Sequence, residues 1–279
     1  MAPILGHALI SHIVFILIIG LLSTLFLVIP SSCFNPNKLV NVTSYSSSHS
    51  SWSSSVATWY GDANGDGSED GACGYGNAVG EPPFFSMISA GSPVIYNSGK
   101  GCGSCYEVKC TENSACSGNP VSVVITDECV ECGSDTQYHF DLSGSAFSSM
   151  AISGRNQELR YAGKLAIQHR RVSCNYIGMS IAFHVDIGSN QDYFAILIEY
   201  VNGDGNLNKV ELMEAIHSAS WNTMKQSWGA LWKLSKGAPL KAPFSIKLTT
   251  LESGKTFVAQ NVIPIDWEPG QTYSSVGNF

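Results

Sequence analysis

The sequence predicts an all-β protein with two domains, and two observations carry this prediction. From Val56 onward, short apolar stretches alternate with clusters of Gly, Asn, Asp and Ser, and no long helical period appears. This pattern is typical of short strands joined by turns. Every cysteine but one lies between Cys73 and Cys174, whereas the remaining hundred-odd residues hold no cysteine and are rich in tryptophan. A chain of 279 residues is long enough for two hydrophobic cores.

The chain begins with an apolar run over residues 10–29, which fits a cleaved signal peptide or a membrane span. The run ends in the small residues Pro30-Ser31-Ser32-Cys33, and removing 1–33 leaves eight of the nine cysteines, an even number. We therefore expect a signal peptide over 1–33 and a secreted, extracellular protein. Residues 34–55 are Ser-rich and are expected to form an exposed, flexible extension, in which Asn41 begins a glycosylation sequon.

Beyond this extension, several segments have the composition of β-strands. The predicted strands are 121–127, 164–172, 194–201 and 243–251, and a turn at 252–255 leads from the last of these into a further strand over 256–263. Residues 144–151 predict a short helix, whereas 210–219 fit either a helix or a strand. Because the composition shifts at 174–178, we place a linker there, with one β domain at 56–175 and another at 179–279.

The composition excludes several classes of partner. Charged residues make up 13% of the chain and the formal net charge is -7. Binding to nucleic acid or to an anionic membrane surface depends on dense patches of Lys and Arg, so neither is expected. A low charge combined with many Gly, Ser, Thr and aromatic residues suits an uncharged ligand rich in hydroxyl groups.

The cysteines predict disulfide bonds rather than metal ligands. Close pairs at Cys102/Cys105 and Cys129/Cys132 have the spacing of zinc knuckles, but disulfides are the better interpretation in a secreted chain. Cys129-Val130-Glu131-Cys132 is also a CxxC motif, for which a redox role is the alternative. It lacks a preceding thioredoxin-like βαβ pattern, so we interpret it as a small structural loop. Two Asp- and Gly-rich segments, 62–67 and 202–206, lack the spacing of a calcium-binding loop, and no metal or cofactor is expected.

A histidine and an aspartate lie two residues apart near residue 140. If 138–142 is a strand, His139 and Asp141 point to one face and Phe140 to the other, because side chains alternate along a strand. Asp127, which ends the strand at 121–127, is a second acid, although a turn residue at a strand end is the simpler interpretation of it alone.

Several motifs resemble those of the plant expansins, in particular the β-expansins. In the first half these motifs are Thr58-Trp59-Tyr60-Gly61, GACGYG (71–76), GKGCGSCYEVKC (99–110), ITDEC (125–129) and HFDLSGSAF (139–147). In the second half they are QSWGALWKL (226–234), APFSIKLTTLESGKT (242–256) and NVIP (261–264). The resemblance covers essentially the whole chain after the signal peptide, in the family's order and spacing.

The resemblance implies a six-stranded double-psi β-barrel followed by an immunoglobulin-like, carbohydrate-binding β-sandwich. It further implies a monomeric plant cell-wall protein that loosens the wall at acidic pH. Such a protein weakens noncovalent contacts among cellulose and xylan-type glycans without cleaving them, and it needs no cofactor. The disulfides that the resemblance implies are Cys73–Cys102, Cys105–Cys174 and Cys110–Cys116, with Cys129–Cys132 as a local pair.

The same resemblance assigns functional residues. The polar residues of the barrel groove would be Thr58, Tyr60, Asp127, His139 and Asp141, with Trp59 as a surface aromatic and Tyr193 and Trp228 as the sugar-stacking surface of the second domain. The family carries an acid before Cys73, and of Glu69 and Asp70 we expect Asp70 to supply it, although the spacing departs from the family's pattern.

Two rival functions stay open at this point. The first domain also resembles family 45 endoglucanases, which are inverting enzymes that need one acidic and one basic carboxyl group. Asp141 matches their acid, and an ungapped count from Thr58 puts Asp62 at the base, although its Gly- and Asp-rich surroundings favour a loop residue. The other rival is a passive carbohydrate-binding protein. Released reducing sugar would identify the first rival, and binding without wall loosening would identify the second.

Overall fold

The structure is a computed structural model, and it describes residues 51–133, 137–214 and 220–279. These residues all belong to one compact unit, Ser47–Phe279. The expected signal peptide, the sequon at Asn41 and most of the expected extension lie outside the described residues. Within the described ranges, no helix is both long enough and apolar enough to cross a membrane.

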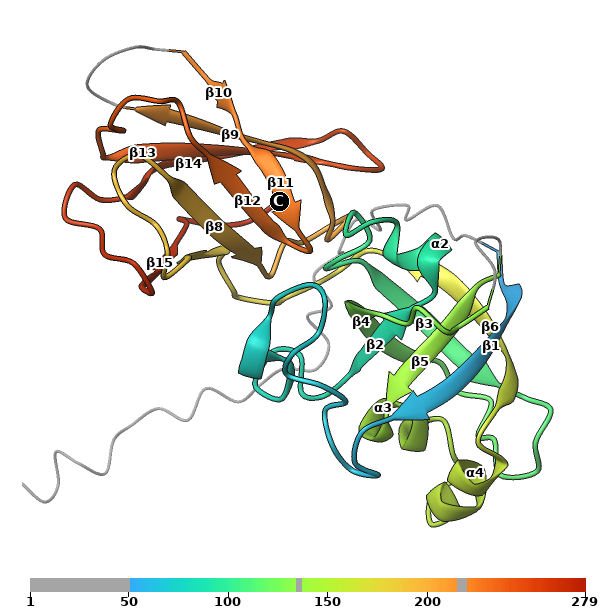
Figure 1. Ribbon diagram of the computed structural model, residues 1–279. Helices are drawn as coiled ribbons and strands as arrows, with labels where there is room; N and C mark the ends of the chain where they lie inside the picture. The colour runs from blue at the N-terminus through green and yellow to red at the C-terminus, as the bar shows by residue number, and fades with distance from the viewer. Residues whose placement is uncertain (1–50, 134–136, 215–219) are drawn as a thin grey trace, which may run out of the picture. The chain divides into compact units, whose positions relative to one another are not determined.

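Six strands from the first half close into a barrel, which confirms the fold expected for this half (Figure 1). Neighbouring strands follow the order β1-β5-β2-β4-β3-β6, so segments distant in sequence lie side by side. The pairs β1·β5 and β2·β4 are parallel, and the other pairs are antiparallel. The strands are β1 Ser53–Tyr60, β2 Ile88–Gly91, β3 Cys105–Cys110, β4 Val121–Glu128, β5 His139–Ser143 and β6 Leu165–Val172.

Alternation of side chains along these strands separates the barrel core from the barrel surface. Ala57 of β1 lies opposite Phe140 of β5, and both are fully buried in one apolar cluster with Ile125 and Leu142. The strands expected at 121–127 and 164–172 correspond to β4 and β6.

Strand β1 begins earlier than the sequence suggested. Ser53–Ser55 were expected in the flexible extension, but they pair with His169, Gln168 and Ile167 of β6. Trp52 lies just before them, with Lys109 Nζ 4.1 Å from its ring centroid and the Arg170 guanidinium 4.6 Å away. The Ser-rich composition indicated an extension, whereas the pairing with β6, a tertiary contact, makes these residues part of the barrel.

Short helices connect the barrel strands, and α3 (Gly144–Ser149) is the helix that the sequence predicted. Ser143 caps it, because its hydroxyl accepts a 3.0 Å hydrogen bond from the Ala146 N–H. Helix α4 (Asn156–Ala162) was not expected, since seven mostly polar residues carry little apolar periodicity. Both helices lie together at one end of the barrel, near β1 and β5 (Figure 1). The remaining short helices are η1 Gly76–Val79 and α2 Pro93–Tyr96.

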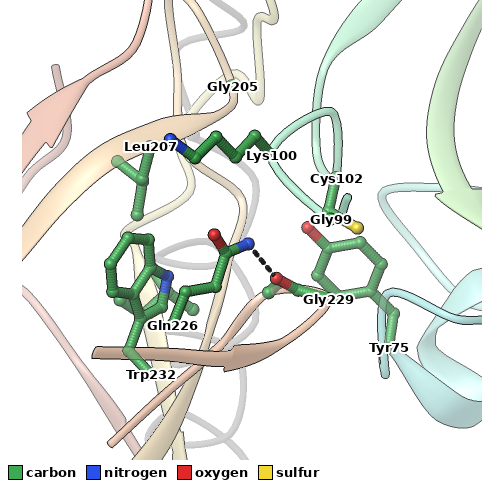
Figure 2. Close-up of a pocket in the computed structure, with 11 residues that line it drawn as sticks. Tyr75, Gly99, Lys100, Cys102, Gly205, Leu207, Gln226, Gly229 and Trp232 are labelled. Carbon is green, nitrogen blue, oxygen red and sulfur yellow. Dashed lines mark hydrogen bonds between the residues drawn. The ribbon is translucent and has the colours of Figure 1, made fainter. Parts of the chain in front are cut away.

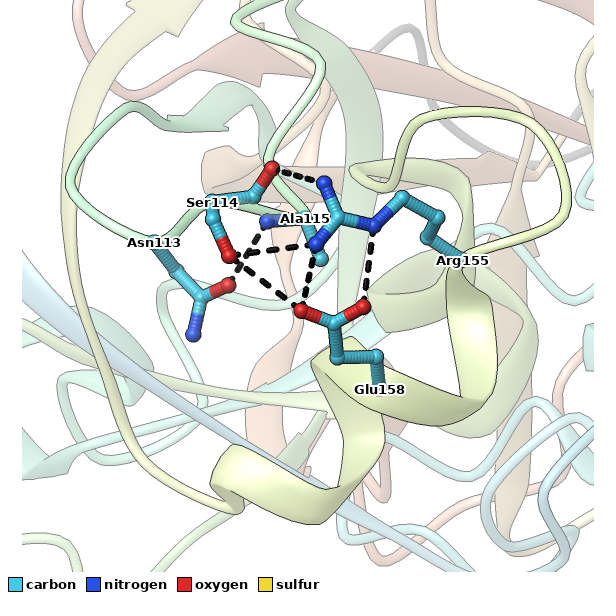
Figure 3. A network of polar contacts seen from close by, with 5 residues as sticks. All are labelled: Asn113, Ser114, Ala115, Arg155 and Glu158. Atoms are coloured by element: carbon cyan, nitrogen blue, oxygen red, sulfur yellow. Dashed lines mark hydrogen bonds and ion pairs between the residues drawn. The ribbon is translucent and has the colours of Figure 1, made fainter.

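A polar network attaches the loop after β3 to α4 (Figure 3). The Arg155 Nε donates to Glu158 Oε2 at 2.9 Å, and Arg155 Nη2 donates to the Ser114 hydroxyl at 3.1 Å. The guanidinium of Arg155 and the hydroxyl of Ser114 lower the pKa of Glu158 by hydrogen bonding to its ionised form. These contacts are solvent-exposed, so they position the loop more than they stabilise the fold.

Among the described residues of the second half, nine strands form two antiparallel sheets that enclose a second core, as expected for a β-sandwich. The four-stranded sheet has the order β10-β9-β13-β14, and the five-stranded sheet has the order β11-β12-β8-β7-β15. The strands of the first sheet are β9 Leu207–Glu214, β10 Asn222–Thr223, β13 Phe244–Thr250 and β14 Thr256–Ile263. The strands of the second sheet are β7 Ala182–Val185, β8 Phe194–Glu199, β11 Lys225–Trp228, β12 Leu231–Leu234 and β15 Thr272–Ser274.

The ambiguous segment at 210–219 resolves in favour of a strand as far as it is described, since β9 extends to Glu214. Residues 215–219 lie outside the described residues. The expected strands at 194–201, 243–251 and 256–263 correspond to β8, β13 and β14.

Strand β8 is buried on both faces, which explains its unbroken apolar sequence. Phe194, Ile196 and Ile198 enter the sandwich core. Ala195 and Leu197 point to the other side, into a cluster that also contains Cys73 and other barrel residues. The last barrel strand ends at Val172 and the first sandwich strand begins at Ala182. The domain division at 174–178 is consistent with these strand ends and remains a prediction.

In the described part of the chain, four disulfides crosslink the barrel half. The bonded pairs are Cys73–Cys102, Cys105–Cys174, Cys110–Cys116 and Cys129–Cys132, with Cα separations of 5.5, 5.3, 5.4 and 5.2 Å. The Cys105–Cys174 bond spans 69 residues of sequence and joins β3 to the segment that follows β6. It therefore closes most of the barrel in one covalent loop.

Candidate functional site

A row of four residues crosses the outer wall of the barrel. Thr58 of β1 lies opposite Asp141 of β5, Asp141 lies opposite Ala90 of β2, and Ala90 lies opposite Asp127 of β4. Residues directly opposite one another point to the same face of a sheet. Since Phe140 lies in the core, its neighbour Asp141 points away from the core, and the row lines the barrel surface. The row thus has two carboxyl groups separated by one small side chain.

A β-bulge places Asp127 in this row. Ser89 pairs with Ile125, but the next residue, Ala90, pairs with Asp127, so Thr126 is an extra residue on β4. In an unbroken register, Thr126 would lie opposite Ala90 and Asp127 would point to the other face. Neighbouring strands are about 4.8 Å apart, so the Cα atoms of Asp141 and Asp127 lie about 10 Å apart across β2.

Thr58 joins His139 to Asp141. Its hydroxyl donates a 2.5 Å hydrogen bond to Asp141 Oδ1, and its oxygen lies 2.9 Å from His139 Nε2. Because the hydroxyl proton is used on Asp141, the histidine must donate, which assigns the proton to Nε2 in the neutral ring. The result is a chain of donors from His139 through Thr58 to the Asp141 carboxylate.

Burial shifts the pKa values of Asp141 and His139 in the directions that favour their neutral forms. The pKa of Asp141 is raised, first by burial and then by the negative charge of Asp127, against the opposing effects of Thr58 and His139. The pKa of His139 is lowered by burial and by Lys164, against the effect of Asp141. A neutral Asp141 is a hydrogen-bond donor at the barrel surface, whereas its ionised form accepts only.

Asp127 is held differently from Asp141. Its Oδ1 accepts hydrogen bonds of 2.7 Å from the backbone N–H groups of Ala72 and Glu128. This fixes the carboxylate against the loop that contains Cys73, and it leaves Oδ2 as the oxygen available to a ligand. The two acids of the row therefore have different partners, a side-chain hydroxyl for Asp141 and two backbone amides for Asp127.

Tyr60 lies next to both acids. Its hydroxyl is buried. Burial, followed by the charges of Asp127 and Asp141, raises its pKa far above the ordinary value, so the hydroxyl stays protonated. Gly67 has a φ of +77°, and a Cβ there would lie 2.6 Å from Tyr60 Cζ, so only glycine permits this packing.

Some residues that the sequence singled out lie elsewhere. Asp62 is an exposed turn residue whose carbonyl accepts a hydrogen bond from the Gly65 N–H. Asp70 is also exposed, and its N–H donates to the Ser68 hydroxyl. The acid of this segment whose charge acts on Tyr60 is instead Asp66. The assignment of Asp70 to the groove remains a prediction.

Trp59 lies on the opposite face of β1 from Thr58 and Tyr60, in line with Leu142. It is half-buried, its ring centroid lies 6.4 Å from that of Phe147, and its indole N–H donates to the Arg160 carbonyl at 3.3 Å. These contacts fit a packing residue and a sugar-stacking residue equally well. The role of Trp59 in sugar binding therefore also remains a prediction.

Trp228 of the sandwich lies against the loop that holds Asp127. It is 52% exposed, and its ring packs so closely on Gly74 that a Cβ there would come within 2.8 Å of it. Tyr193 packs against the same cluster of residues, which includes Leu197 and Cys73. Both expected sandwich aromatics therefore adjoin one apolar cluster, and Trp228 has an exposed ring.

A small pocket lies beside this contact (Figure 2). Gln226 crosses it and donates a 2.7 Å hydrogen bond to the Gly229 carbonyl, while Tyr75 and Trp232 form walls on either side. The Ala230 N–H donates to the Cys73 carbonyl at 3.0 Å. The pocket is too small for a polymer chain, and these contacts instead position the β11–β12 turn that carries Trp228.

Sequence reasoning missed Ala90 and Asp66. Nothing in the local sequence marks Ala90, because its importance is its small side chain between two acids from other strands. Asp66 belongs to the Gly- and Asp-rich segment 62–67, whose composition indicates only a turn. Its position next to Gly80, where an added Cβ would meet Asp66 Oδ2 at 2.6 Å, is a tertiary contact.

Known families and proteins match both halves of the chain. Family models described as "Expansin C-terminal domain" and "Lytic transglycolase" match residues 181–264 and 88–168. Expansin-B11 of Oryza sativa subsp. japonica is 56% identical over 82% of this chain and 78% of its own length. Expansin-B3 of Arabidopsis thaliana is 47% identical over 83% of this chain and 87% of its own length.

A solved structure shares the fold. The expansin of Clavibacter michiganensis matches 82% of this chain and 98% of its own chain, with a TM-score of 0.62 and 21% identity. At this identity the match establishes the architecture of barrel and sandwich alone. The family rests on the curated relatives: their identity and coverage, together with the closed barrel and the sandwich, show that the chain belongs to the expansin family, in its B group.

Proposed function

We propose that this expansin is a secreted plant cell-wall protein that loosens the wall by competing for the hydrogen bonds between glycan chains, without cleaving them. The observation that carries the proposal is the row Thr58–Asp141–Ala90–Asp127 on the barrel surface. A mutant of the Clavibacter michiganensis expansin has been solved in complex with cellohexaose, and we extend a glycan ligand of this type to the present chain.

The role of Asp141 follows from its raised pKa. At mildly acidic pH a larger share of this carboxyl group is protonated than an exposed aspartate would allow, so it donates a hydrogen bond to a glycan oxygen. As the pH rises through its pKa, the group ionises and loses this donor. Loosening should therefore be greatest at acidic pH and decline toward neutrality.

Ala90 separates the two acids along the row but is itself buried, so a glycan would meet the partly exposed carboxyl groups of Asp141 and Asp127 on either side of it. Trp228 adds an exposed ring on which the C–H face of a sugar can stack. Stacking that buries about 100 Å² would contribute about 2 kcal/mol. Binding of this strength is reversible, which suits a protein that moves along a polymer network.

The second candidate function is hydrolysis by an inverting mechanism, and one observation favours it. The two acids of the row lie two strands apart, and inverting glycosidases have carboxyl groups roughly 6.5–9.5 Å apart. Asp127, rather than Asp62, would then be the base. Two backbone amides occupy Asp127 Oδ1, so Oδ2 would be the oxygen that takes a proton from water.

The proposal is tested by creep of heat-inactivated wall strips under constant load at acidic pH, with reducing sugar measured in the bath. Purified wild-type protein should extend the strips without releasing sugar. Asp141→Asn removes the acidic proton but keeps the shape, and it should reduce extension at least tenfold while cellulose binding persists. Retained extension in this variant would contradict the role of Asp141.

Asp62→Asn is the matched control, since it makes the same change on an exposed turn of the same barrel. It should extend the strips as wild type does. If sugar is released and Asp127→Asn abolishes that release, the hydrolase is the correct function. If cellulose is bound but no variant or wild-type protein extends the strips, the chain is a passive carbohydrate-binding protein.

A further inference from the structure

The Cys129–Cys132 disulfide lies beside the Asp141 carboxyl group. One ligand atom from each of these three residues lies within 4.8 Å of the others, and among the described residues this is the one group of three or more His, Cys, Asp and Glu side chains so arranged. Cys129 directly follows β4, which carries Asp127, so the disulfide borders the row of polar residues.

Backbone hydrogen bonds anchor this loop in addition to the disulfide. The Cys129 N–H donates to the Gly91 carbonyl at 2.8 Å, and the Cys132 N–H donates to the Cys129 carbonyl at 3.2 Å. Asp141 is positioned independently, by the pairing of β5 with β1 and β2. If the S–S bond opened, both sulfur atoms would therefore remain close to the carboxyl group.

We propose that reduction of the Cys129–Cys132 disulfide creates a binding site for a thiophilic divalent cation, of the Zn²⁺ or Cd²⁺ class, formed by Cys129, Cys132 and Asp141. Two thiolates and one carboxylate are ligands that Zn²⁺ accepts, and Cys-x-x-Cys is a spacing found in tetrahedral sites. Zn–S bonds of about 2.3 Å put two sulfur ligands about 3.8 Å apart. The Cα atoms, 5.2 Å apart, allow this after a small rotation of the side chains.

The redox step is a thiol–disulfide exchange with an external dithiol. The dithiol is oxidised to its own disulfide, and its two electrons and two protons convert the S–S bond into the thiols of Cys129 and Cys132. Cation binding then forms two metal–sulfur bonds and releases the two thiol protons. Water fills the fourth position.

Of the four disulfides, this one is best placed to open reversibly. Cys129 and Cys116 are partly exposed, whereas the Cys73–Cys102 and Cys105–Cys174 disulfides are buried at both ends. The loop that it closes is the shortest, with a sequence separation of 3. Its loss therefore releases the least chain entropy, so the barrel should keep its fold when this pair alone is reduced.

The test is cation uptake by the full mature chain after limited reduction. The protein is treated with a dithiol, freed of it without oxygen, and mapped by alkylation and mass spectrometry to identify the opened pair. Near-ultraviolet circular dichroism checks the fold, and Cd²⁺ is then titrated while thiolate-to-cadmium absorption is recorded. We expect one Cd²⁺ per reduced chain, displaced by Zn²⁺, and none per oxidised chain.

Three variants separate this site from other thiols. Cys129→Ser/Cys132→Ser should abolish uptake after the same treatment, and Asp141→Asn should weaken it at least tenfold. Cys110→Ser/Cys116→Ser removes the other short-loop disulfide and should leave uptake unchanged. A second measurement avoids reduction altogether: Cys129→His/Cys132→His should bind Zn²⁺ in the oxidised protein, with the three other disulfides intact.

Several results would overturn the proposal. These are no uptake by chains reduced at Cys129 and Cys132, equal affinity in Asp141→Asn, uptake that persists in the serine double variant, or unfolding once this pair opens. The readout is cation binding, so it does not depend on wall loosening. A chain that extends walls but binds no cation would refute this inference and leave the proposed function intact.

Discussion

The barrel and the sandwich of this expansin achieve a folded β structure by different means. The barrel carries all four disulfides and places acids, a histidine and a buried tyrosine hydroxyl on or near its wall. The sandwich strands contain no cysteine, and its two sheets enclose a continuous apolar core that includes Phe183, Phe194 and Phe244. The difference suggests that crosslinks offset the cost of a polar groove, where burial of titratable groups opposes stability.

The largest expected effect is the loss of the long-range disulfide. Cys105→Ala/Cys174→Ala should lower the free energy of unfolding by about 4 kcal/mol, because it frees a 69-residue loop in the unfolded state. Cys129→Ala/Cys132→Ala should cost about 2 kcal/mol, since its loop spans 3 residues. Denaturant unfolding measures both. Equal losses for the two pairs would show that loop length does not determine how the barrel is stabilised.

In the sandwich, the change expected to lower stability by a similar amount is Phe194→Ala. Phe194 is fully buried between Phe244 and Trp267, with ring centroids 5.0 and 5.2 Å away, so its truncation should cost about 3–5 kcal/mol. A dithiol added to this variant should destabilise the barrel half and leave the sandwich unaffected. Hydrogen exchange resolved by segment measures this, and if reduction exposed the sandwich amides, the proposed contrast between the two halves would be wrong.

Glu199 of β8 is the sandwich's one acid with a strongly raised pKa among the described residues, and burial raises it from 4.5 to about 7. The folded protein therefore binds this proton more tightly than the unfolded chain does. The contribution to stability is fully present below about pH 4.5 and is lost as the pH rises through about 7, for a total of up to about 3 kcal/mol.

Glu199→Gln removes this titration. The difference between the unfolding free energies of variant and wild type should therefore grow in favour of the variant between about pH 4.5 and 7. Taking the difference cancels the opposite contribution of His139 and His169, whose lowered pKa values favour the folded state at higher pH. A difference that does not change with pH would mean that Glu199 is better solvated than its burial indicates.

Substitution of Trp228 is expected to have a smaller effect, and this effect concerns ligand affinity rather than the free energy of unfolding. Trp228→Ala removes an exposed ring and should weaken cellulose binding by roughly tenfold, or about 1–2 kcal/mol. Unfolding should change little, because half of the side chain already faces solvent. Depletion assays on cellulose measure the affinity, and unchanged binding would remove Trp228 from the proposed stacking surface.

The smallest effect distinguishes packing from binding at Trp59. Trp59→Phe keeps an aromatic ring but deletes the hydrogen bond to the Arg160 carbonyl, so it should cost about 1 kcal/mol of stability. Cellulose binding should stay within twofold of wild type if Trp59 is a packing residue. A larger loss of binding at unchanged stability would restore it to the sugar-binding surface.

Much of the architecture was predictable because it depends on local patterns. Strand β4 follows from the β-branched run that begins at Val121, and α3 follows from a Ser143 cap before small and apolar residues. The ambiguity at 210–219 could not be resolved locally, because strand or helix there depends on pairing with β13. Helix α4 was missed since its seven residues bury little more than Leu159.

The sequence by itself determined the all-β class, the concentration of disulfides in one half and the expansin resemblance, because these depend on composition and motif order. It also determined that His139 and Asp141 share a face, because side chains alternate with a period of two along a strand. Only the tertiary structure decided that Asp127 joins Asp141 across Ala90, since this requires the bulge at Thr126 and the non-sequential strand order of the barrel. It also decided that Asp62 is exposed and that Cys129 and Cys132 lie beside Asp141. These contacts depend on strand pairing and on the bulge, and no local pattern encodes them.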